Sequence, residues 1–292
     1  MQTVSQKYLI VFVGLPAHGK SFLAKKLCSF FNSLEIPARI FNLGDIRRKV
    51  ISQNFDSNFF KHDNQEAQNS RELCAQLSLE EATEFLQSAE KAVAFYDGTN
   101  TTEERRNWLR GELAKTDFKV VWIEKIIQND EICLQNVRLS KLNGADYKNF
   151  ETKDLAFQDF MSRIEEYKKA YVPITDREIT EMGDQGFFVI YNLGESVRVV
   201  REKPTKDLVW FLLENYLLKI YTKKKKVIFE EPQNECENGS HDLKNGVVRI
   251  GDSESLMSVT RMIFESEQID FVVSGHKNKQ LLESFKRAFD YS

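Results

Sequence analysis

The sequence predicts an α/β protein whose mainly parallel sheet has helices on both faces. Short apolar runs with the composition of β-strands alternate with longer segments of helical periodicity, which is the rhythm of a parallel sheet wrapped by helices. A glycine-rich loop separates the first strand-like run from the first helical segment. Together these two observations indicate a P-loop NTPase-type fold, to which the end of the chain adds a small C-terminal α/β remnant.

The expected elements follow one another along the first 220 residues. Strands are expected at 9–13, 39–42, 92–96, 119–123 and 187–191, where the sequence is apolar and rich in β-branched and aromatic residues. Helices are expected at 21–34, 64–89, 103–115, 129–142, 154–171 and 205–220, where helical patterns occur. Phosphate-binding loops in such folds lie at the carboxyl edge of the sheet, so functional residues are expected after strand ends.

Length and composition fit one large domain with a smaller appendage. The chain has 292 residues, and its 41% apolar content is enough for a substantial core. The composition changes at Thr222 and the lysine run 223–226, beyond which the chain is acidic and loop-like to residue 245. We interpret the run as a solvated linker and expect a domain at 1–222 and a separate segment at 223–292. A short strand-like run at 271–273 lies between two apolar helical patterns.

Charge and cysteine content exclude several kinds of partner. The 41 basic and 44 acidic residues nearly cancel, so no global field would recruit nucleic acid or an anionic membrane. The polar start of the chain and the absence of a bilayer-spanning apolar stretch predict a cytoplasmic protein. Cys28, Cys74, Cys133 and Cys236 form no CxxC pair, so neither a disulfide framework nor a zinc site is expected. Any phosphate recognition must therefore be local.

The loop Gly14–Ser21 has the spacing G-x-x-x-x-G-K-S. Its glycines let backbone N–H groups surround phosphates, Lys20 reaches the β and γ phosphates, and the Ser21 hydroxyl ligates Mg2+. The helix that begins near Lys20 adds its N-terminal dipole. Such a short pattern also arises by chance, but the strand before it and the amphipathic stretch after it favour the functional reading. The sequence therefore predicts that the chain binds a nucleoside triphosphate with Mg2+.

Asp97 ends the third expected strand. That is the usual place for a carboxylate that holds Mg2+ or its water opposite a phosphate loop. Alone, Asp97 could equally cap a helix or shape a turn, but its pairing with the loop favours a functional role. Basic residues also follow several strand ends, and because arginine binds phosphate bidentately, the set predicts a second phosphate-bearing ligand, although each one alone fits a surface charge. They are Arg47, Arg48, Arg105, Arg106, Lys141 and Arg163.

A long ordered series of motifs runs through the same region. It comprises GLPAHGKS at 14–21, FNLGDIRR at 41–48, NFF and DN within 58–64 followed by Arg71, YDGTNTTEERR at 96–106, Asn136 with Lys141, ADY at 145–147, and FMSRIEEY at 160–167. With this series, residues 8–220 resemble the kinase half of the bifunctional 6-phosphofructo-2-kinase/fructose-2,6-bisphosphatase family. The series is far more specific than a phosphate loop alone.

The resemblance implies a role for each matching residue. ATP would lie on Gly14, Leu15, Pro16, Ala17, His18, Gly19, Lys20, Ser21 and Phe22 and along Asn136 to Lys141. Fructose 6-phosphate would be held by Arg47, Arg71, Thr99, Arg105, Lys141, Arg163 and Tyr167. Lys20 and Asp97 would be catalytic, and Ser21 and Asp97 would hold Mg2+. The reaction implied is transfer of the γ-phosphoryl group to the sugar 2-hydroxyl, driven mostly by positioning and charge neutralisation. A homodimer is left open.

The chain departs from the family pattern at three positions in the kinase half. His18 stands where the family usually has arginine, and Gly98 where it has alanine. Ile127 aligns with the active-site cysteine of the family, a residue often assigned to substrate or nucleotide binding. The loss of this cysteine bears on affinity more than on the class of reaction.

The C-terminal segment resembles the phosphatase half of the family only in degenerate form. There a strand is followed by Arg-His-Gly, whose histidine accepts the phosphoryl group. Here the comparable strand, 226–229, is followed by Glu230-Glu231-Pro232-Gln233, and neither His241 nor His276 has an Arg-His-Gly setting. The segment is also shorter than the family's phosphatase domain. We expect no bisphosphatase activity and a structural role for this segment.

Two alternatives remain open. A small P-loop kinase of the polynucleotide kinase type has a similar strand-end aspartate followed by a Thr-Asn pair. Arg71, Arg163 and Tyr167 distinguish the sugar-phosphate hypothesis, because a polynucleotide substrate favours a broad basic groove. A catalytically weak regulatory subunit that binds ATP and sugar phosphate is the second alternative, motivated by Ile127 and the degenerate C-terminal segment.

Overall fold

The computed structural model describes residues 6–51, 56–61, 63–148, 150–183, 185–200, 207–222, 226–230, 270–274, 283–284 and 287–288. Contacts divide the chain into two units, one of residues 1–24 and 39–204 and one of residues 25–38 and 205–292. The domain boundary expected at residue 222 stays a prediction. Several residues named above lie outside the described ranges: Lys223–Lys225, Glu231–Gln233, Cys236, His241, His276 and most of the helical patterns around 271–273.

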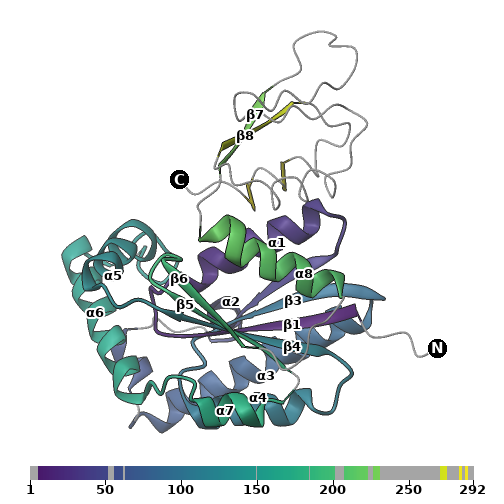
Figure 1. The fold of residues 1–292 in the computed structure, drawn as a ribbon. Helices are drawn as coiled ribbons and strands as arrows, with labels where there is room; N and C mark the ends of the chain where they lie inside the picture. Colours follow the sequence, from purple (N-terminus) through teal and green to yellow (C-terminus); the bar gives the residue numbers. More distant parts are fainter. Residues whose placement is uncertain are drawn as a thin grey trace, which may run out of the picture. The chain divides into compact units, whose positions relative to one another are not determined.

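A six-stranded sheet in the order β2-β3-β1-β4-β5-β6 forms the first unit's centre (Figure 1). Its strands are β1 (Gln6–Val13), β2 (Ala38–Asn42), β3 (Lys91–Asp97), β4 (Lys119–Ile126), β5 (Gly186–Tyr191) and β6 (Ser196–Val200). β1 pairs in parallel with β3 and β4, so that Ile10 lies between Phe95 and Val121. β4 and β5 are also parallel, whereas β6 is antiparallel to β5. The expected mainly parallel α/β fold is confirmed, with β6 as an unexpected addition.

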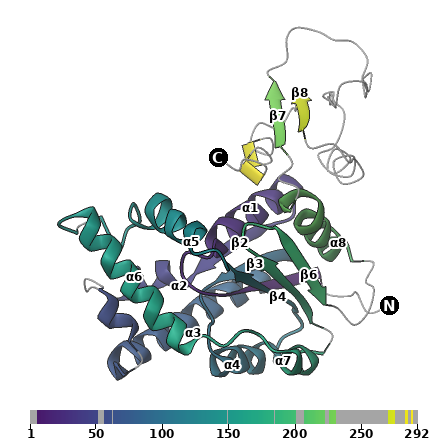
Figure 2. The same ribbon diagram turned by 60° about the vertical axis from the view of Figure 1, so that its left-hand side comes forward.

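Both faces of the central strands are buried, which explains why these strands are apolar throughout rather than alternating. On one face they pack with α3 (Gln65–Gln87), α4 (Glu103–Leu113) and residues in and beside α7 (Asp176–Glu181), as Figures 1 and 2 show. This core includes Leu9, Val11, Ala94, Trp122 and Val189 from the strands and Leu79, Leu86, Leu109 and Met182 from the helical layer. Strand residues of the opposite face, such as Ile10, Phe12 and Phe95, are equally buried.

Side-chain caps fix where several helices begin. Asn42 accepts a hydrogen bond from the Asp45 N–H at the start of α2 (Leu43–Val50), and Asn64 caps α3 in the same way. Thr102 caps α4, and Thr152 caps α6 (Lys153–Ala170). Such caps satisfy N–H groups that have no partner within the helix. They also place Asp45 in the first turn of α2, directly after β2, and Arg105 in the first turn of α4, after the loop 98–102 that follows β3.

All six expected helices are present. Besides α3, α4 and α6 they are α1 (Lys20–Ser33), α5 (Asp130–Asn136) and α8 (Leu208–Asn215). α5 and α8 continue into π-helical turns, η2 (Val137–Lys141) and η3 (Tyr216–Tyr221), which extend the helices expected at 129–142 and 205–220 to residues 141 and 221. Residues 205 and 206 of the second range lie outside the described residues. The helical elements missed were α2, the 3-10 helix η1 (Ser57–Phe60) and α7, which are too short for a periodic signal.

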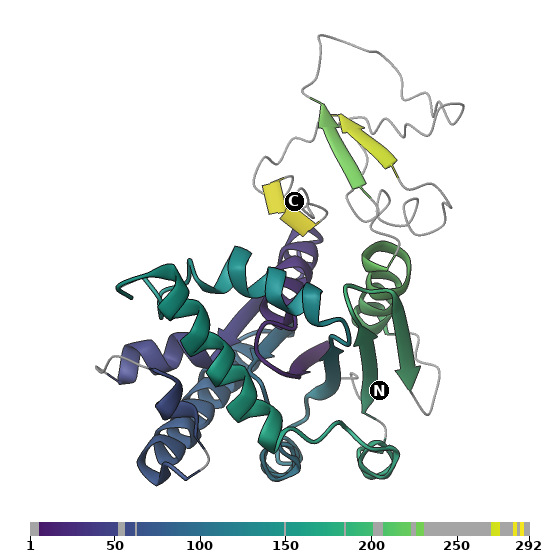
Figure 3. The same ribbon diagram turned by 90° about the vertical axis from the view of Figure 1, so that its left-hand side faces the viewer.

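α5 and α6 lie at the carboxyl end of the strands, the end that faces the viewer in Figure 3. A second apolar cluster joins them to the glycine-rich loop. It contains Ala17 from the loop, Val137 from η2, Tyr147, and Ala156, Phe160 and Ile164 from α6. The segment 130–170 is thus packed against the loop at the edge where functional residues are expected.

Within the second unit, the later part of α1 contacts η3. The rings of Phe30 and Tyr216 lie 4.7 Å apart between centroids, and Tyr216 donates a 2.5 Å hydrogen bond to the Ala288 carbonyl. β7 (Lys226–Glu230) and β8 (Asp270–Ser274) form a parallel two-stranded sheet, which confirms the strands expected near 226–229 and 271–273. Across the described residues, we find no helix with the length and apolar content that a bilayer crossing demands.

Candidate active site

The loop between β1 and α1 has a backbone that few residue types adopt. Gly14 and Gly19 have φ values of +133° and +78°, in the region that favours glycine. A Cβ on Gly14 would lie only 2.4 Å from the Lys125 carbonyl oxygen, so β4 approaches too closely for any side chain there. The Gly14 N–H donates to the Thr99 carbonyl at 2.9 Å. The loop is therefore held between the ends of β3 and β4.

Lys20 belongs to the Gly14–Ser21 loop motif, is the first residue of α1, and is buried. Its Nζ donates to the carbonyls of Gly14 at 2.8 Å and Leu15 at 2.6 Å. Burial lowers the pKa of Lys20 to about 7; the Asp97 carboxylate opposes this, while the charges of Lys141 and Arg163 reinforce it. An anion bound beside this lysine would stabilise its protonated form against burial and against the neighbouring cations. This is the environment expected of a phosphate-binding lysine.

Asp97 ends β3 and is buried beside Lys20's charge. Its Oδ2 accepts a 2.5 Å hydrogen bond from the side-chain amide of Asn42, which also caps α2. Asn42 thus fixes the carboxylate, a function that the sequence motif FNLGD did not reveal. Ser21 occupies the first turn of α1, next to Lys20.

Ser21 and Asp97 offer the hard oxygen donors that Mg2+ prefers. In the part of the chain that the structure describes, no group of three or more His, Cys, Asp or Glu side chains forms a metal cage. Mg2+ in nucleotide sites is usually held by one or two protein oxygens together with phosphates, so these residues fit it without such a cage. A hydroxyl and one strand-end carboxylate are the donor set expected for a nucleotide-bound ion.

Four of the predicted sugar-phosphate residues converge on the Phe59–Phe60 pair of η1. The Arg163 guanidinium lies 3.9 Å from the centre of the Phe60 ring, and that of Arg47 lies 5.4 Å from it. The Tyr167 and Phe60 ring centroids are 5.6 Å apart, and Arg71 donates to the Phe59 carbonyl. Stacked arginines keep their edge N–H groups available for an anion.

Asp146 joins two of these arginines. Its carboxylate accepts hydrogen bonds from Arg47 at 2.5 Å, Arg48 at 2.8 Å and Arg163 at 3.2 Å. Burial alone would raise the pKa of Asp146, but the charges of Arg47 and Arg163 hold it well below its usual range. One partly buried carboxylate thus orients guanidinium groups from α2 and α6. The ADY motif contained this residue, but nothing in the sequence gave it a role.

The remaining predicted residues lie around the loop and the arginines. Asn136 donates from its side chain to the Ala17 carbonyl at 2.9 Å, which joins α5 to the loop. The Arg105 guanidinium lies 5.4 Å from the centre of the Trp108 ring. Burial lowers the pKa of Arg71, and the charge of Arg105 contributes to this. Lys141 ends η2, and its charge adds to the effect of burial in lowering the pKa of Lys20. Phe22 is 41% exposed on α1, and its predicted contact with ATP stays a prediction.

Arg106 has a different environment from the other basic residues after strand ends. It is fully buried and forms a two-armed ion pair with Glu178, with N···O distances of 2.6 and 2.8 Å. Its remaining arm donates to the Asn100 carbonyl at 3.2 Å. Arg106 is thus part of the structural support of the loop after β3, in which Asn100 has a φ of +44°.

His18 and Ile127, two of the departures from the family pattern, contact each other. The Ile127 N–H donates to the His18 Nδ1 at 3.3 Å. Burial and then the Lys20 charge lower the pKa of His18 to about 4, so the ring is neutral near pH 7. His18 therefore joins the loop to the end of β4 through a neutral ring and adds no charge to the phosphate site.

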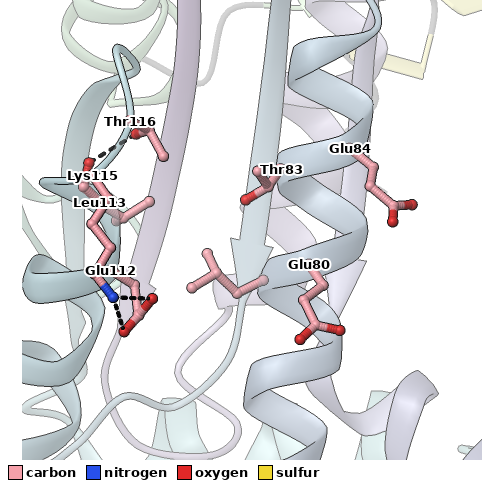
Figure 4. Close-up of a pocket in the computed structure, with 8 residues that line it drawn as sticks. Glu80, Thr83, Glu84, Glu112, Leu113, Lys115 and Thr116 are labelled. Carbon is pink, nitrogen blue, oxygen red and sulfur yellow. Dashed lines mark hydrogen bonds and ion pairs between the residues drawn. The ribbon is translucent and has the colours of Figure 1, made fainter.

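A groove of about 320 Å3 lies elsewhere, between α3 and α4 (Figure 4). Glu112 and Lys115 form an ion pair of 2.8 Å on one of its sides. Its other lining residues are Leu79, Glu80, Thr83, Glu84, Leu113 and Thr116. No predicted site residue is among them, so the strand ends and not this groove define the candidate site.

The P-loop class of α/β proteins has a glycine-rich phosphate-binding loop at the carboxyl edge of a mostly parallel sheet, with a strand-end aspartate beside the loop lysine. This chain has that fold. Within this class, the chain belongs to the 6-phosphofructo-2-kinase family, whose model matches residues 1–216. The expected family membership is confirmed.

Individual relatives carry the bifunctional name. The "6-phosphofructo-2-kinase/fructose-2,6-bisphosphatase 3" of Bos taurus is 33% identical over 207 residues, covering 70% of this chain and 44% of the relative. The Caenorhabditis elegans enzyme of the same bifunctional name is 34% identical over 217 residues, with 72% and 47% covered. The Gallus gallus enzyme of this name is 36% identical over 169 residues, which cover 58% of this chain and 36% of the relative. The chain spans about half the length of these relatives or less.

Proposed function

We propose that this chain is an ATP-dependent kinase that phosphorylates the 2-hydroxyl of fructose 6-phosphate. The observation that carries the proposal is the placement of an arginine cluster next to a phosphate loop: the charge of Arg163, which pairs with Asp146, also acts on Lys20. A kinase whose acceptor is itself phosphorylated needs two neighbouring anion sites, one for the nucleotide and one for the acceptor phosphate. Family membership supports the same acceptor.

Each group has a defined task in this proposal. Lys20 neutralises charge on the transferring phosphoryl group, and Asp97 orients the attacking hydroxyl. Arg47, Arg71 and Arg163 bind the 6-phosphate, and the remaining predicted residues, Thr99, Arg105, Lys141 and Tyr167, hold the sugar. Bound Mg2+, held by Ser21 and Asp97, would supply charge neutralisation at the phosphates. Because positioning provides most of the rate in phosphoryl transfer, fixing the arginines and Asp97 through Asp146 and Asn42 favours catalysis.

We further propose that the chain does not hydrolyse its product. β7 ends at Glu230, and the sequence continues with Glu231-Pro232-Gln233 where the bisphosphatase half of the family has Arg-His-Gly. Two carboxylates would repel a phosphate, and no histidine is available there as a nucleophile. Incubation of the protein with fructose 2,6-bisphosphate is expected to release no phosphate above a protein-free control.

The D146N variant is expected to raise the KM for fructose 6-phosphate about tenfold or more, which corresponds to about 1.4 kcal/mol. An amide cannot balance the charges of Arg47 and Arg163, so both guanidinium groups lose their fixed orientation. The KM for ATP should change much less, since the residues that Asp146 bonds, Arg47, Arg48 and Arg163, all lie outside the loop. Steady-state kinetics with each substrate varied in turn measures both values.

The D45N variant is the matched control. Asp45 pairs with Arg48 at 2.5 Å on the exposed side of α2 and leaves Arg47 and Arg163 untouched. Its KM values should stay within about twofold of the parent protein, as is usual for exposed ion pairs. Equal KM values for D146N and D45N would show that Asp146 does not organise the acceptor site.

A panel of acceptors distinguishes this proposal from its alternatives. ADP formation from Mg-ATP is measured with fructose 6-phosphate, with an oligonucleotide bearing a 5′-hydroxyl, and without acceptor. The proposal requires turnover with the sugar phosphate only. Turnover with the oligonucleotide alone would favour a polynucleotide kinase, and binding of ATP and sugar phosphate without turnover would favour a regulatory subunit.

A further inference from the structure

A second buried lysine lies against the phosphate loop. Lys125 is on β4, and its side chain is fully buried. Its carbonyl oxygen lies 3.1 Å from the His18 Nδ1 and would be 2.4 Å from a Cβ on Gly14. Its Cε would be 3.8 Å from a Cβ on Gly19. Lys125 therefore contacts the loop near its beginning with the backbone and near its end with the side chain.

The surroundings of the Lys125 ammonium group are fixed. Its Nζ donates to the Asn192 carbonyl at 3.4 Å, on the turn that follows β5. The backbone N–H of Asn192 donates to Ile126 at 2.7 Å, and its side-chain oxygen accepts from Gln128 at 2.9 Å. The carboxyl ends of β4 and β5 thus form a frame that keeps this side chain beside the loop.

The ammonium group is close enough to the loop to act on its titratable residues. Burial lowers the pKa of Lys125 to about 7. Its charge in turn contributes to lowering the pKa of both Lys20 and His18. The ammonium groups of Lys125 and Lys20 repel each other in the free protein, and a polyanion bound to the loop would attract both and offset that repulsion.

We propose that Lys125 is a second nucleotide-binding lysine, whose ammonium group adds positive charge to the loop and strengthens binding of nucleoside di- and triphosphates. It supports the loop from β4 and is not a catalytic residue. The proposal rests on the proposed function only in that the loop binds a nucleotide, and it is independent of the acceptor. Its effect should increase with the number of phosphates on the ligand.

The test compares the K125M variant with the full parent chain by isothermal titration calorimetry, with ATP, ADP and adenosine as ligands. Methionine has a similar length and no charge. We expect ATP affinity to fall about tenfold or more, ADP affinity to fall less, and adenosine affinity to stay within about twofold. The thermal unfolding midpoint should be equal or higher, since a buried charge is removed. The K119M variant, at the other end of β4, should bind all three ligands like the parent.

Proton uptake separates a role of the charge from a distortion of the loop. The titratable groups near the ammonium are Lys20 and His18 on the loop, and Glu195 bonds to the Asn192 side chain on the other side. A bound polyanion raises the pKa of a buried lysine, so ATP binding slightly above pH 7 takes up protons. The number of protons taken up follows from how the ATP-binding enthalpy varies between buffers of different ionisation enthalpy. This number should be smaller for K125M than for the parent.

Three results would overturn the inference: unchanged ATP affinity in K125M, an equal loss for adenosine, or unchanged proton uptake. If K125M is less stable than the parent, K125Q provides the second variant, and the same comparison of the three ligands applies to it. A parent protein that binds no ATP would overturn the proposed function and this inference together. A parent that binds ATP with K125M unimpaired would overturn the inference alone.

Discussion

The K20M variant is expected to lose phosphoryl transfer by at least about 100-fold and to remain folded. Lys20 is buried in the loop, where its Nζ lies 2.8 and 2.6 Å from the carbonyls of Gly14 and Leu15. Phosphoryl transfer relies on charge neutralisation, and methionine supplies none. Burial also lowers the pKa of Lys20 to about 7, so removing the ammonium group removes a cost to the fold. Turnover and the circular dichroism of the variant measure the two effects.

The K25M variant is the control for Lys20. Lys25 lies on the same helix but is exposed, so its replacement should leave turnover within about twofold of the parent. A K20M protein with full activity would contradict the role given to the whole loop. Loss of activity in both variants would show that the helix, and not the loop lysine, is sensitive to substitution.

The R106M variant is expected to lower the free energy of unfolding by about 3–5 kcal/mol, the cost typical of leaving one partner of a buried ion pair alone. Both members of the Arg106–Glu178 pair are fully buried, so the Glu178 carboxylate would remain without its partner charge. Arg106 also donates to the Asn100 carbonyl, which lies between Thr99 and Thr101 after β3. Urea denaturation, followed by fluorescence or circular dichroism, measures the change.

Two further variants check the cause. The double variant R106M/E178L should recover most of the lost stability, because apolar pairs often replace buried ion pairs without loss. The R177M variant removes an exposed pair, Arg177 with Glu103 at 2.6 Å, and should cost less than about 1 kcal/mol. An R106M protein as stable as R177M would contradict the structural role assigned to Arg106.

Long elements and the loop were predictable from sequence because their signals are local. The strands of the central sheet are continuous apolar runs, and the long helices carry a period that spans several turns. The short elements α2, η1 and α7 lack enough residues for such a period, and they depend on caps such as Asn42 and on packing. β6 follows β5 after a tight turn and is only partly buried, so it has no strong apolar run.

Contacts between distant residues explain what the sequence alone did not reveal at the site. Arg105 and Arg106 are adjacent and of the same type, yet only Arg106 meets Glu178, 72 positions later. Asp146 reaches Arg47 across 99 positions, so its role depends on the folded chain. The clustering of predicted residues around Phe60 follows from the fold, whereas their contacts with ATP, sugar phosphate and Mg2+ stay predictions.

Product analysis tests the central claim most directly. The purified protein is incubated with γ-labelled Mg-ATP and fructose 6-phosphate, and the labelled sugar product is then treated with mild acid. We predict a labelled sugar bisphosphate whose new phosphate is released by acid, as expected of a 2-phosphate, and which the protein itself does not hydrolyse. An acid-stable product, or no labelled sugar despite ATP binding, would contradict phosphorylation of the 2-hydroxyl by this site.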